Sequence, residues 1–229
     1  MRILLLSLLI SFSLKAVEKT EQDFQELIDN FEETFLGHDE LKNNKLVIKR
    51  FWKSSKVNAY AYRGPGVWGI KVYGGLYRFP GLDEDGFSLI LCHELGHHLA
   101  GPPLKKGDWS SFEGQADYWS THACLKQLWR DEQWYTPTNS EIVSLCYDSH
   151  FPALCERIIN ASLNVTTIFG RKPPSLLKKD PNKVRKSYPF HLEEQCRLDT
   201  FVSGALCEEK SCSDNKGAKP RCWFNPKEF

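Results

Sequence analysis

Apolar residues recur at helical spacing soon after the start of the chain. Between residues 20 and 36 they fall on one face of a helix, and Thr20 and Asp23 are placed to form a capping box at its start. Three later segments are rich in β-branched and aromatic residues and are separated by Ser, Gly and Pro: 46–52, 58–62 and 67–79. The pattern predicts an amphipathic helix followed by a small β-sheet.

The most apolar helix is predicted over residues 87–101, which read FSLILCHELGHHLAG. Acidic residues at 83–85 precede it and Gly101-Pro102-Pro103 follows it, as is typical of a helix start and stop. Further helices are expected over 110–129, 139–146 and 152–168. We therefore expect an α+β fold that is mostly helical, with a small mixed β-sheet next to the helix of residues 87–101.

The buried helix contains the motif HELGH, from His93 to His97. Two histidines four positions apart project from one face of a helix, where both imidazoles can bind one zinc ion. Glu94 then lies beside the metal and can take a proton from a zinc-bound water, which is the general-base role in metallopeptidases. Burying these three side chains is costly unless they are paired or bind a metal, so a zinc site is favoured over a surface helix.

A third metal ligand is needed, and one pattern is excluded. Metzincins require glycine and histidine at the positions that Ala100 and Pro103 occupy. On the next predicted helix, Glu113 and Asp117 are four positions apart. They suit a gluzincin site in which Glu113 binds zinc and Asp117 accepts the free ring N–H of a ligand histidine. The alternative is that Glu113 only forms a capping box with Ser110.

Four other histidines are also candidates for the third ligand: His98, His122, His150 and His191. His98 is about 100° around the helix from His97, so we expect it to point away from the metal.

The N-terminal residues 1–16 are predicted to be a secretory signal peptide. Arg2 is followed by a short apolar segment, Ile3 to Leu14, that is too short for an ordinary transmembrane helix, and Ala16 is suited to precede a cleavage site. An uncleaved membrane anchor is the alternative. We expect residues 17–229 to form a single domain in the periplasm or cell exterior, with no stable membrane span after cleavage.

Overall charge gives no indication of a nucleic-acid or anionic lipid partner. The formal net charge of the chain is +1, and loss of Arg2 and Lys15 with the signal peptide would make it −1. Residues 171–189 contain seven Lys or Arg and four Pro. We interpret this segment as a solvated loop rather than as an anion-binding site.

Eight cysteines in an exported chain indicate an oxidising compartment and several disulfides. The four in the tail of residues 196–229, which looks poor in regular structure, are expected to bond among themselves: Cys196, Cys207, Cys212 and Cys222. If the two predicted zinc helices are antiparallel with Asp117 opposite His93, Cys92 and Cys124 are about 10 Å apart along the axis, too far for a disulfide. Cys92 is about 100° around the helix from His93, so we interpret it as a buried structural cysteine rather than a zinc ligand.

The segment from Ile70 to Leu76 is the expected binding place of a polypeptide substrate. Gly74 and Gly75 indicate a close backbone approach, and a strand at a sheet edge can pair with an extended chain. We therefore expect substrate to bind there as an added strand.

The ordered set NAYAY, a strand ending in GGLY, HELGH and EGQAD resembles the HtpX-like zinc metallopeptidases, over roughly residues 20–205. That gluzincin group includes the CAAX prenyl endopeptidases and periplasmic quality-control peptidases. The resemblance implies a zincin-like fold and one Zn²⁺ ion held by His93, His97 and Glu113. It also implies Glu94 as the catalytic base and Asp117 as the group that orients a ligand histidine.

The family also carries a late His-Pro pair followed by an arginine six residues after the histidine. His191 and Arg197 keep this spacing, although Leu192 replaces the proline. The resemblance implies that His191 stabilises the transition state. The cysteine-rich tail lies outside the resemblance.

These observations predict a zinc-dependent endopeptidase that hydrolyses extracytoplasmic polypeptides. Two alternatives remain: a non-catalytic binding or chaperone module with a structural zinc, and a zinc amidase acting on cell-wall peptides. A structural site is closed by four ligands and has no use for an acid at Glu94, which favours the catalytic interpretation.

Overall fold

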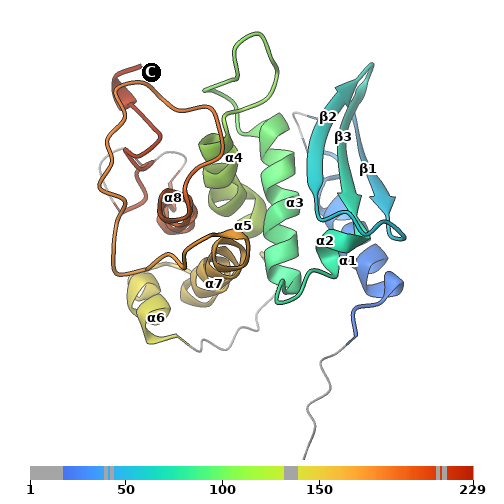
Figure 1. Ribbon diagram of the computed structural model, residues 1–229, viewed down its shortest axis with the longest axis horizontal. Helices are drawn as coiled ribbons and strands as arrows, with labels where there is room; N and C mark the ends of the chain where they lie inside the picture. The colour runs from blue at the N-terminus through green and yellow to red at the C-terminus, as the bar shows by residue number, and fades with distance from the viewer. Residues whose placement is uncertain are drawn as a thin grey trace, which may run out of the picture.

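Helix α3 (Glu84–Leu99) lies at the centre of the molecule, between a small sheet on one side and most of the other helices on the other (Figure 1). The computed structural model describes residues 18–38, 41, 44–131, 139–209, 212 and 216–228. The signal peptide predicted for residues 1–16 lies outside the described residues. The chain is α+β, as predicted, with a three-stranded mixed sheet.

Helix α3 carries apolar residues on several sides and is buried on nearly all sides. Leu89, Leu91 and Leu95 are fully buried, and the predicted acidic start is present, since the Asp83 carboxylate accepts a hydrogen bond from the Gly86 N–H. An all-round apolar helix is stable only in the interior of a protein. This burial determines the environment of every polar side chain that the helix carries.

The sheet has the strand order β1-β3-β2. Strands β1 (Lys45–Phe51) and β3 (Val67–Tyr73) are parallel, and β2 (Ala59–Gly64) is antiparallel to β3. The prediction that Ile70–Leu76 forms an edge strand is therefore wrong. Its first part is paired on both sides, and its second part belongs to the short helix α2 (Gly74–Tyr77). Hydrophobic periodicity predicts strands but carries no information about pairing order.

The two edges of the sheet have different surroundings. Helix α1 (Glu21–Phe35), whose Thr20–Asp23 capping box is confirmed, packs beside β1, and Glu32 accepts the N–H of Ile48 at 3.0 Å. Strand β2 forms the other edge, and its Ala61 N–H donates to Glu94 of α3 at 2.8 Å. The edge strand beside α3 is therefore β2.

The remaining helices follow α3 in the chain and contact one another. They are α4 (Glu113–Trp119), the π-helical turn η2 (Ser120–Cys124), α5 (Leu125–Leu128), α6 (Ser140–Cys146), α7 (Pro152–Phe169), α8 (Glu194–Leu206) and the 3₁₀ turn η3 (Pro226–Glu228). The capping box of Ser110 and Glu113 is not formed, because the residue that caps α4 is Phe112, without a side-chain hydrogen bond. Helix α8 also corrects the expectation that the tail from residue 196 is poor in regular structure. Its Leu198 and Phe201 are buried, so tertiary packing stabilises it.

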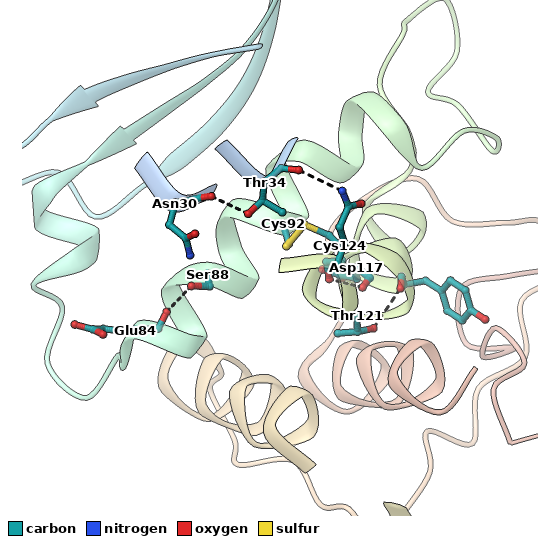
Figure 2. Close-up of a disulfide and its surroundings, with 11 residues drawn as sticks. Asn30, Thr34, Glu84, Ser88, Cys92, Asp117, Thr121 and Cys124 are labelled. Carbon is teal, nitrogen blue, oxygen red and sulfur yellow. Dashed lines mark hydrogen bonds between the residues drawn. A yellow bond between two sulfur atoms is a disulfide. The ribbon is translucent and has the colours of Figure 1, made fainter. Parts of the chain in front are cut away.

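Four disulfides are formed, and one corrects a prediction. Cys92 of α3 is bonded to Cys124 of η2, with their Cα atoms 5.6 Å apart (Figure 2). The predicted separation assumed two straight helices aligned antiparallel along their whole length. In the structure the π-helical turn η2 packs directly on α3, so this alignment does not hold at Cys124. The other three pairs are Cys146–Cys155, Cys196–Cys222 and Cys207–Cys212. The prediction that the four tail cysteines bond among themselves is confirmed.

Disulfides in this number fit a protein of an oxidising compartment. In the part of the chain that the structure describes, no helix has both the length and the apolar character needed to cross a bilayer.

Removal of Cys92–Cys124 should destabilise the protein more than removal of Cys207–Cys212. The first pair is separated by 32 residues and the second by 5. Since a disulfide restricts the unfolded chain more when it closes a longer loop, we expect losses of about 3–4 kcal/mol for the double alanine variant of the first pair and about 2 kcal/mol for that of the second. Urea unfolding of both variants measures the difference, and equal losses would contradict the loop-length argument.

Candidate metal centre

Helices α3 and α4 approach each other closely at Gly96. A Cβ atom on Gly96 would lie 3.0 Å from both Cα and the carbonyl oxygen of Ala116, so a larger residue would push the helices apart. This contact brings the face of α3 that carries His93 and His97 next to the first turn of α4, which carries Glu113.

Three buried side chains converge there: His93, His97 and Glu113. Their potential ligand atoms all lie within 4.8 Å of one another. Nε2 of His93 is 3.3 Å from Oε2 of Glu113, and Nε2 of His97 is 3.7 Å from Oε1 of Glu113. Two imidazole nitrogens and one carboxylate oxygen at this spacing could hold a metal ion. The structure thus brings together the three residues that the sequence predicts as ligands.

The other ring nitrogen of each histidine is held by the protein. Nδ1 of His93 donates to Oδ1 of Asp117 at 2.7 Å, and Nδ1 of His97 donates to the carbonyl oxygen of Ser111 at 3.1 Å. These bonds fix both rings with Nε2 towards Glu113, which is the tautomer that a metal ligand requires. Asp117 is itself held by Arg197, whose Nη2 is 3.0 Å from Oδ1.

The charges at the centre are set by burial and by close partners. Burial lowers the pKa of His97 to about 3, so its ring is neutral and its Nε2 lone pair is free to bind a metal. Burial also lowers the pKa of His93, but the carboxylates of Asp117, Glu113 and Glu94 together outweigh this and raise the value to about 10. Binding of a metal at Nε2 of His93 must therefore displace a proton.

Both acidic partners of the histidines are ionised. Burial would raise the pKa of Glu113, but contacts with His191 and His93 bring it below its ordinary value. Burial acts on the pKa of Asp117 in the same direction, and the Arg197 guanidinium and the His93 ring together more than compensate. Oε2 of Glu113 is buried and accepts no hydrogen bond, although His93 and His191 lie close to it. A buried carboxylate oxygen in this state is well suited to a metal ligand.

Glu94 is the acidic residue of α3 that faces the sheet. It is 8 % exposed, and its Oε2 accepts the Ala61 N–H of β2. Burial raises its pKa, and the neighbouring charge of Glu113 acts in the same direction. A carboxylate with a raised pKa is a stronger base than a solvated one, as general-base chemistry requires.

The centre opens into a cleft of about 520 Å³. One wall is the segment 57–61, which includes the start of β2, and the opposite wall includes residues 105–110 and His191. Val165 and Phe169 of α7 add an apolar surface. Glu94 and the three candidate ligands all line this space, so the centre is accessible to a molecule in the cleft.

Lys105 is a part of the centre that the sequence does not reveal. Its ammonium lies 2.7 Å from Oε1 of Glu113. The residue belongs to the connection between α3 and α4, where it forms no motif, and only the folded chain brings it to the carboxylate. A positive charge at this place fixes the orientation of Glu113 and leaves Oε2 as the oxygen without a hydrogen bond.

The remaining histidines do not join the three candidate ligands. His98 points away, as predicted, and its ring is stacked between Trp68 and Trp109. His122 and His150 contact residues of the segment after α8. His191 lies at the mouth of the cleft, 79 % exposed, with Nδ1 3.1 Å from Oε2 of Glu113.

Comparison with known proteins adds no assignment: no family model, no curated sequence and no solved structure matches the chain. The properties of the centre therefore stand on its own geometry.

Loss of a candidate ligand should abolish metal binding. We expect the purified chain to bind about one divalent ion, and the variants His93→Ala, His97→Ala and Glu113→Ala to lose most of it, because each change removes one of the three donors. Elemental analysis after dialysis against zinc measures this. His150→Ala is the matched control, since it removes an exposed histidine outside the centre, and equal metal loss in that variant would contradict the assignment.

Proposed function

We propose that this protein is a zinc-dependent endopeptidase acting on extracytoplasmic polypeptides. The observation that carries the proposal is the position of Glu94. It lies on the same helix as two candidate ligands, faces the cleft, and contacts the edge strand β2. An acid placed beside a candidate metal site and beside the outer edge of a sheet is suited to peptide hydrolysis.

The donor set supports zinc as the metal. Two neutral imidazoles and one carboxylate are a ligand set of catalytic zinc sites, which keep a further position open. The cleft in front of Glu113 supports an open position and argues against a closed structural site. When bound, zinc would polarise the scissile carbonyl and lower the pKa of water.

The protein's own groups supply the proton transfers. Glu94 would accept a proton from the attacking water while the water oxygen bonds to the carbonyl carbon. It would then deliver that proton to the leaving nitrogen as the C–N bond breaks. The products are a carboxylic acid and an amine. Asp117 and Arg197 would hold the ring of His93 in place through this sequence.

His191 is suited to stabilise the developing oxyanion. Its ring lies at the mouth of the cleft, close to Glu113, and is free enough of packing to turn towards a substrate. A hydrogen bond from this ring to the oxyanion would strengthen as charge develops there.

Substrate would bind along β2 rather than along Ile70–Leu76, where it was expected. The β2 edge lies next to Glu94, and an extended polypeptide can pair with the backbone groups of an edge strand. This arrangement is consistent with a zincin-like fold and with the resemblance to HtpX-like peptidases. The four disulfides and the apolar N-terminal segment support export to the periplasm or cell exterior.

Substitution of Glu94 by Gln should abolish peptide hydrolysis and leave the zinc content of the protein unchanged. Loss of the base should lower kcat by roughly 10²–10⁴-fold, because the carboxamide cannot accept the proton of water. Cleavage of an unfolded polypeptide and the zinc content of each protein are the measurements. Glu84→Gln, on the same helix but at its start, is the control. Equal cleavage by the parent and Glu94→Gln would refute Glu94 as the base.

His191→Ala should lower kcat by about 10²–10³-fold with little change in KM or in bound zinc. The reason is that an oxyanion contact acts mainly in the transition state. Steady-state kinetics on one peptide substrate separate the two parameters. A change in KM alone would assign His191 to substrate binding instead. His150→Ala, which also removes an exposed histidine, should have no effect.

A further inference from the structure

The sheet carries a local positive charge that the net charge of the chain conceals. Residues 44–82 contain eight Lys or Arg and no Asp or Glu, whereas the whole chain has a formal net charge of only +1. Charge that is concentrated on one element can attract a partner even when the global field is weak.

Much of this charge lies on the face of the sheet opposite α3. Side chains alternate between the two faces of a strand, and Ala59 and Ala61 of β2 lie on the same face as their buried register partners Val72 and Ile70, on the side of α3. The side chains on the opposite face of the strands, together with Lys56 of the β1–β2 connection, form a surface that we call the tyrosine–lysine face. It consists of Lys49, Phe51, Lys56, Tyr60, Tyr62, Lys71 and Tyr73.

The rings and ammonium groups of this face contact one another. The rings of Phe51 and Tyr73 are stacked at 5.1 Å, and Lys56 lies 4.8 Å from the centre of the Tyr73 ring. Lys71 lies 5.0 Å from the ring of Tyr60 and 5.2 Å from that of Tyr62. Such contacts order the long lysine side chains without neutralising them.

A glycine makes room for one of the rings. A Cβ atom on Gly69 of β3 would lie 2.2 Å from the ring of Tyr62, so this ring rests against the strand backbone where a side chain would otherwise stand. The ring of Tyr62 therefore lies flat on the sheet, and the ammonium groups of Lys49 and Lys71 lie over it.

The lysines of this face are available to a partner. Among the described residues, Lys49, Lys56 and Lys71 make ring contacts and no ion pair with a carboxylate. A hydrogen bond with Tyr60 raises the pKa of Lys71, so its ammonium is charged at any physiological pH. Lys49, Phe51 and Lys56 are exposed.

Strand β2 links this face to the cleft. If a polypeptide adds to the β2 edge, its alternate side chains must lie on the outer side of the sheet, next to Tyr60 and Tyr62. Acidic side chains at those positions would come within reach of the lysines. We propose that the tyrosine–lysine face selects acidic polypeptide, so that substrates carry Asp or Glu at alternate positions along the strand that pairs with β2. This inference rests on the proposed peptidase function.

The edge of β2 favours a polypeptide as the partner over another polyanion, because only a polypeptide can pair with its backbone groups. A nucleic acid or an anionic membrane could meet the lysines, but neither can form the backbone pairing that places it beside Glu94. The binding experiment includes an oligonucleotide and anionic vesicles as probes, so it distinguishes these partners from an acidic polypeptide.

Binding is measured first, with the inactive Glu94→Gln full chain. The probes are two fluorescent peptides of the same length, one with Glu and one with Gln at alternate positions, followed by fluorescence anisotropy. We expect the acidic peptide to bind about tenfold more tightly and to lose this advantage at high salt. The triple change Lys49→Gln, Lys56→Gln and Lys71→Gln should remove most of the advantage, since each exposed ion pair contributes about two- to fivefold.

The matched control is the triple change Lys178→Gln, Lys183→Gln and Lys186→Gln, which removes the same charge from an exposed loop. It should leave the preference for the acidic peptide unchanged. Equal affinity for the two peptides, or equal losses in the two triple variants, would overturn the proposal. So would an oligonucleotide or phosphatidylserine vesicles that bind Glu94→Gln as tightly as the acidic peptide and depend on the same lysines.

Cleavage by the parent chain separates this inference from the peptidase function. If the proposal holds, the triple variant of the tyrosine–lysine face raises KM for the acidic peptide, with a smaller change for the neutral one and little change in kcat. Cleavage without charge preference would overturn the selection of acidic substrates and leave the peptidase intact. Selective binding of the acidic peptide without cleavage of any peptide would refute the peptidase and retain the face as a binding surface.

Discussion

The contact between α3 and α4 at Gly96 is the constraint on which the candidate centre depends. With glycine there, the two helix backbones meet against Ala116, and Glu113 is brought opposite the two histidines. The disulfide Cys92–Cys124 joins α3 to η2, the turn that directly follows α4 (Figure 2). Small residues and a covalent bond together fix a spacing that side-chain packing alone would leave adjustable.

This contact encloses a cluster of ionisable groups, whose burial costs free energy of folding. Five are enclosed near the crossing: His93, Glu94, His97, Glu113 and Asp117. Arg197 and Lys105 supply positive charge against the carboxylates, yet Oε2 of Glu113 still has no hydrogen bond. Replacing such a network with apolar residues is often neutral or stabilising in proteins, so its presence is better explained by chemistry than by stability.

The two edges and the two faces of the small sheet have different surroundings. One edge is covered by α1, through Glu32, and the other meets Glu94 through the backbone of Ala61. One face packs towards α3, while the other carries rings and lysines that form no ion pair with an acidic residue in the part of the chain that the structure describes. A single strand, β2, therefore borders both the cleft and a positively charged surface, which places recognition and proposed chemistry on adjacent parts of one element.

The sequence by itself determined the local features. The helix around residues 87–101, the capping box at Thr20, and the faces that carry His93 with His97 and Glu113 with Asp117 follow from spacings of a few residues, because a helix places positions four apart on one face. These spacings define the two faces, and the close contact of α3 with α4 brings them together.

Only the tertiary structure decided what depends on how elements pack. Packing of the whole chain places β2 at the edge of the sheet, brings Cys92 next to Cys124 of η2, and brings Lys105 next to Glu113. Strand order, the crossing of helices and the course of a connecting segment are set by the summed burial of the whole core. The spacing of neighbouring residues in the sequence does not reveal this total burial.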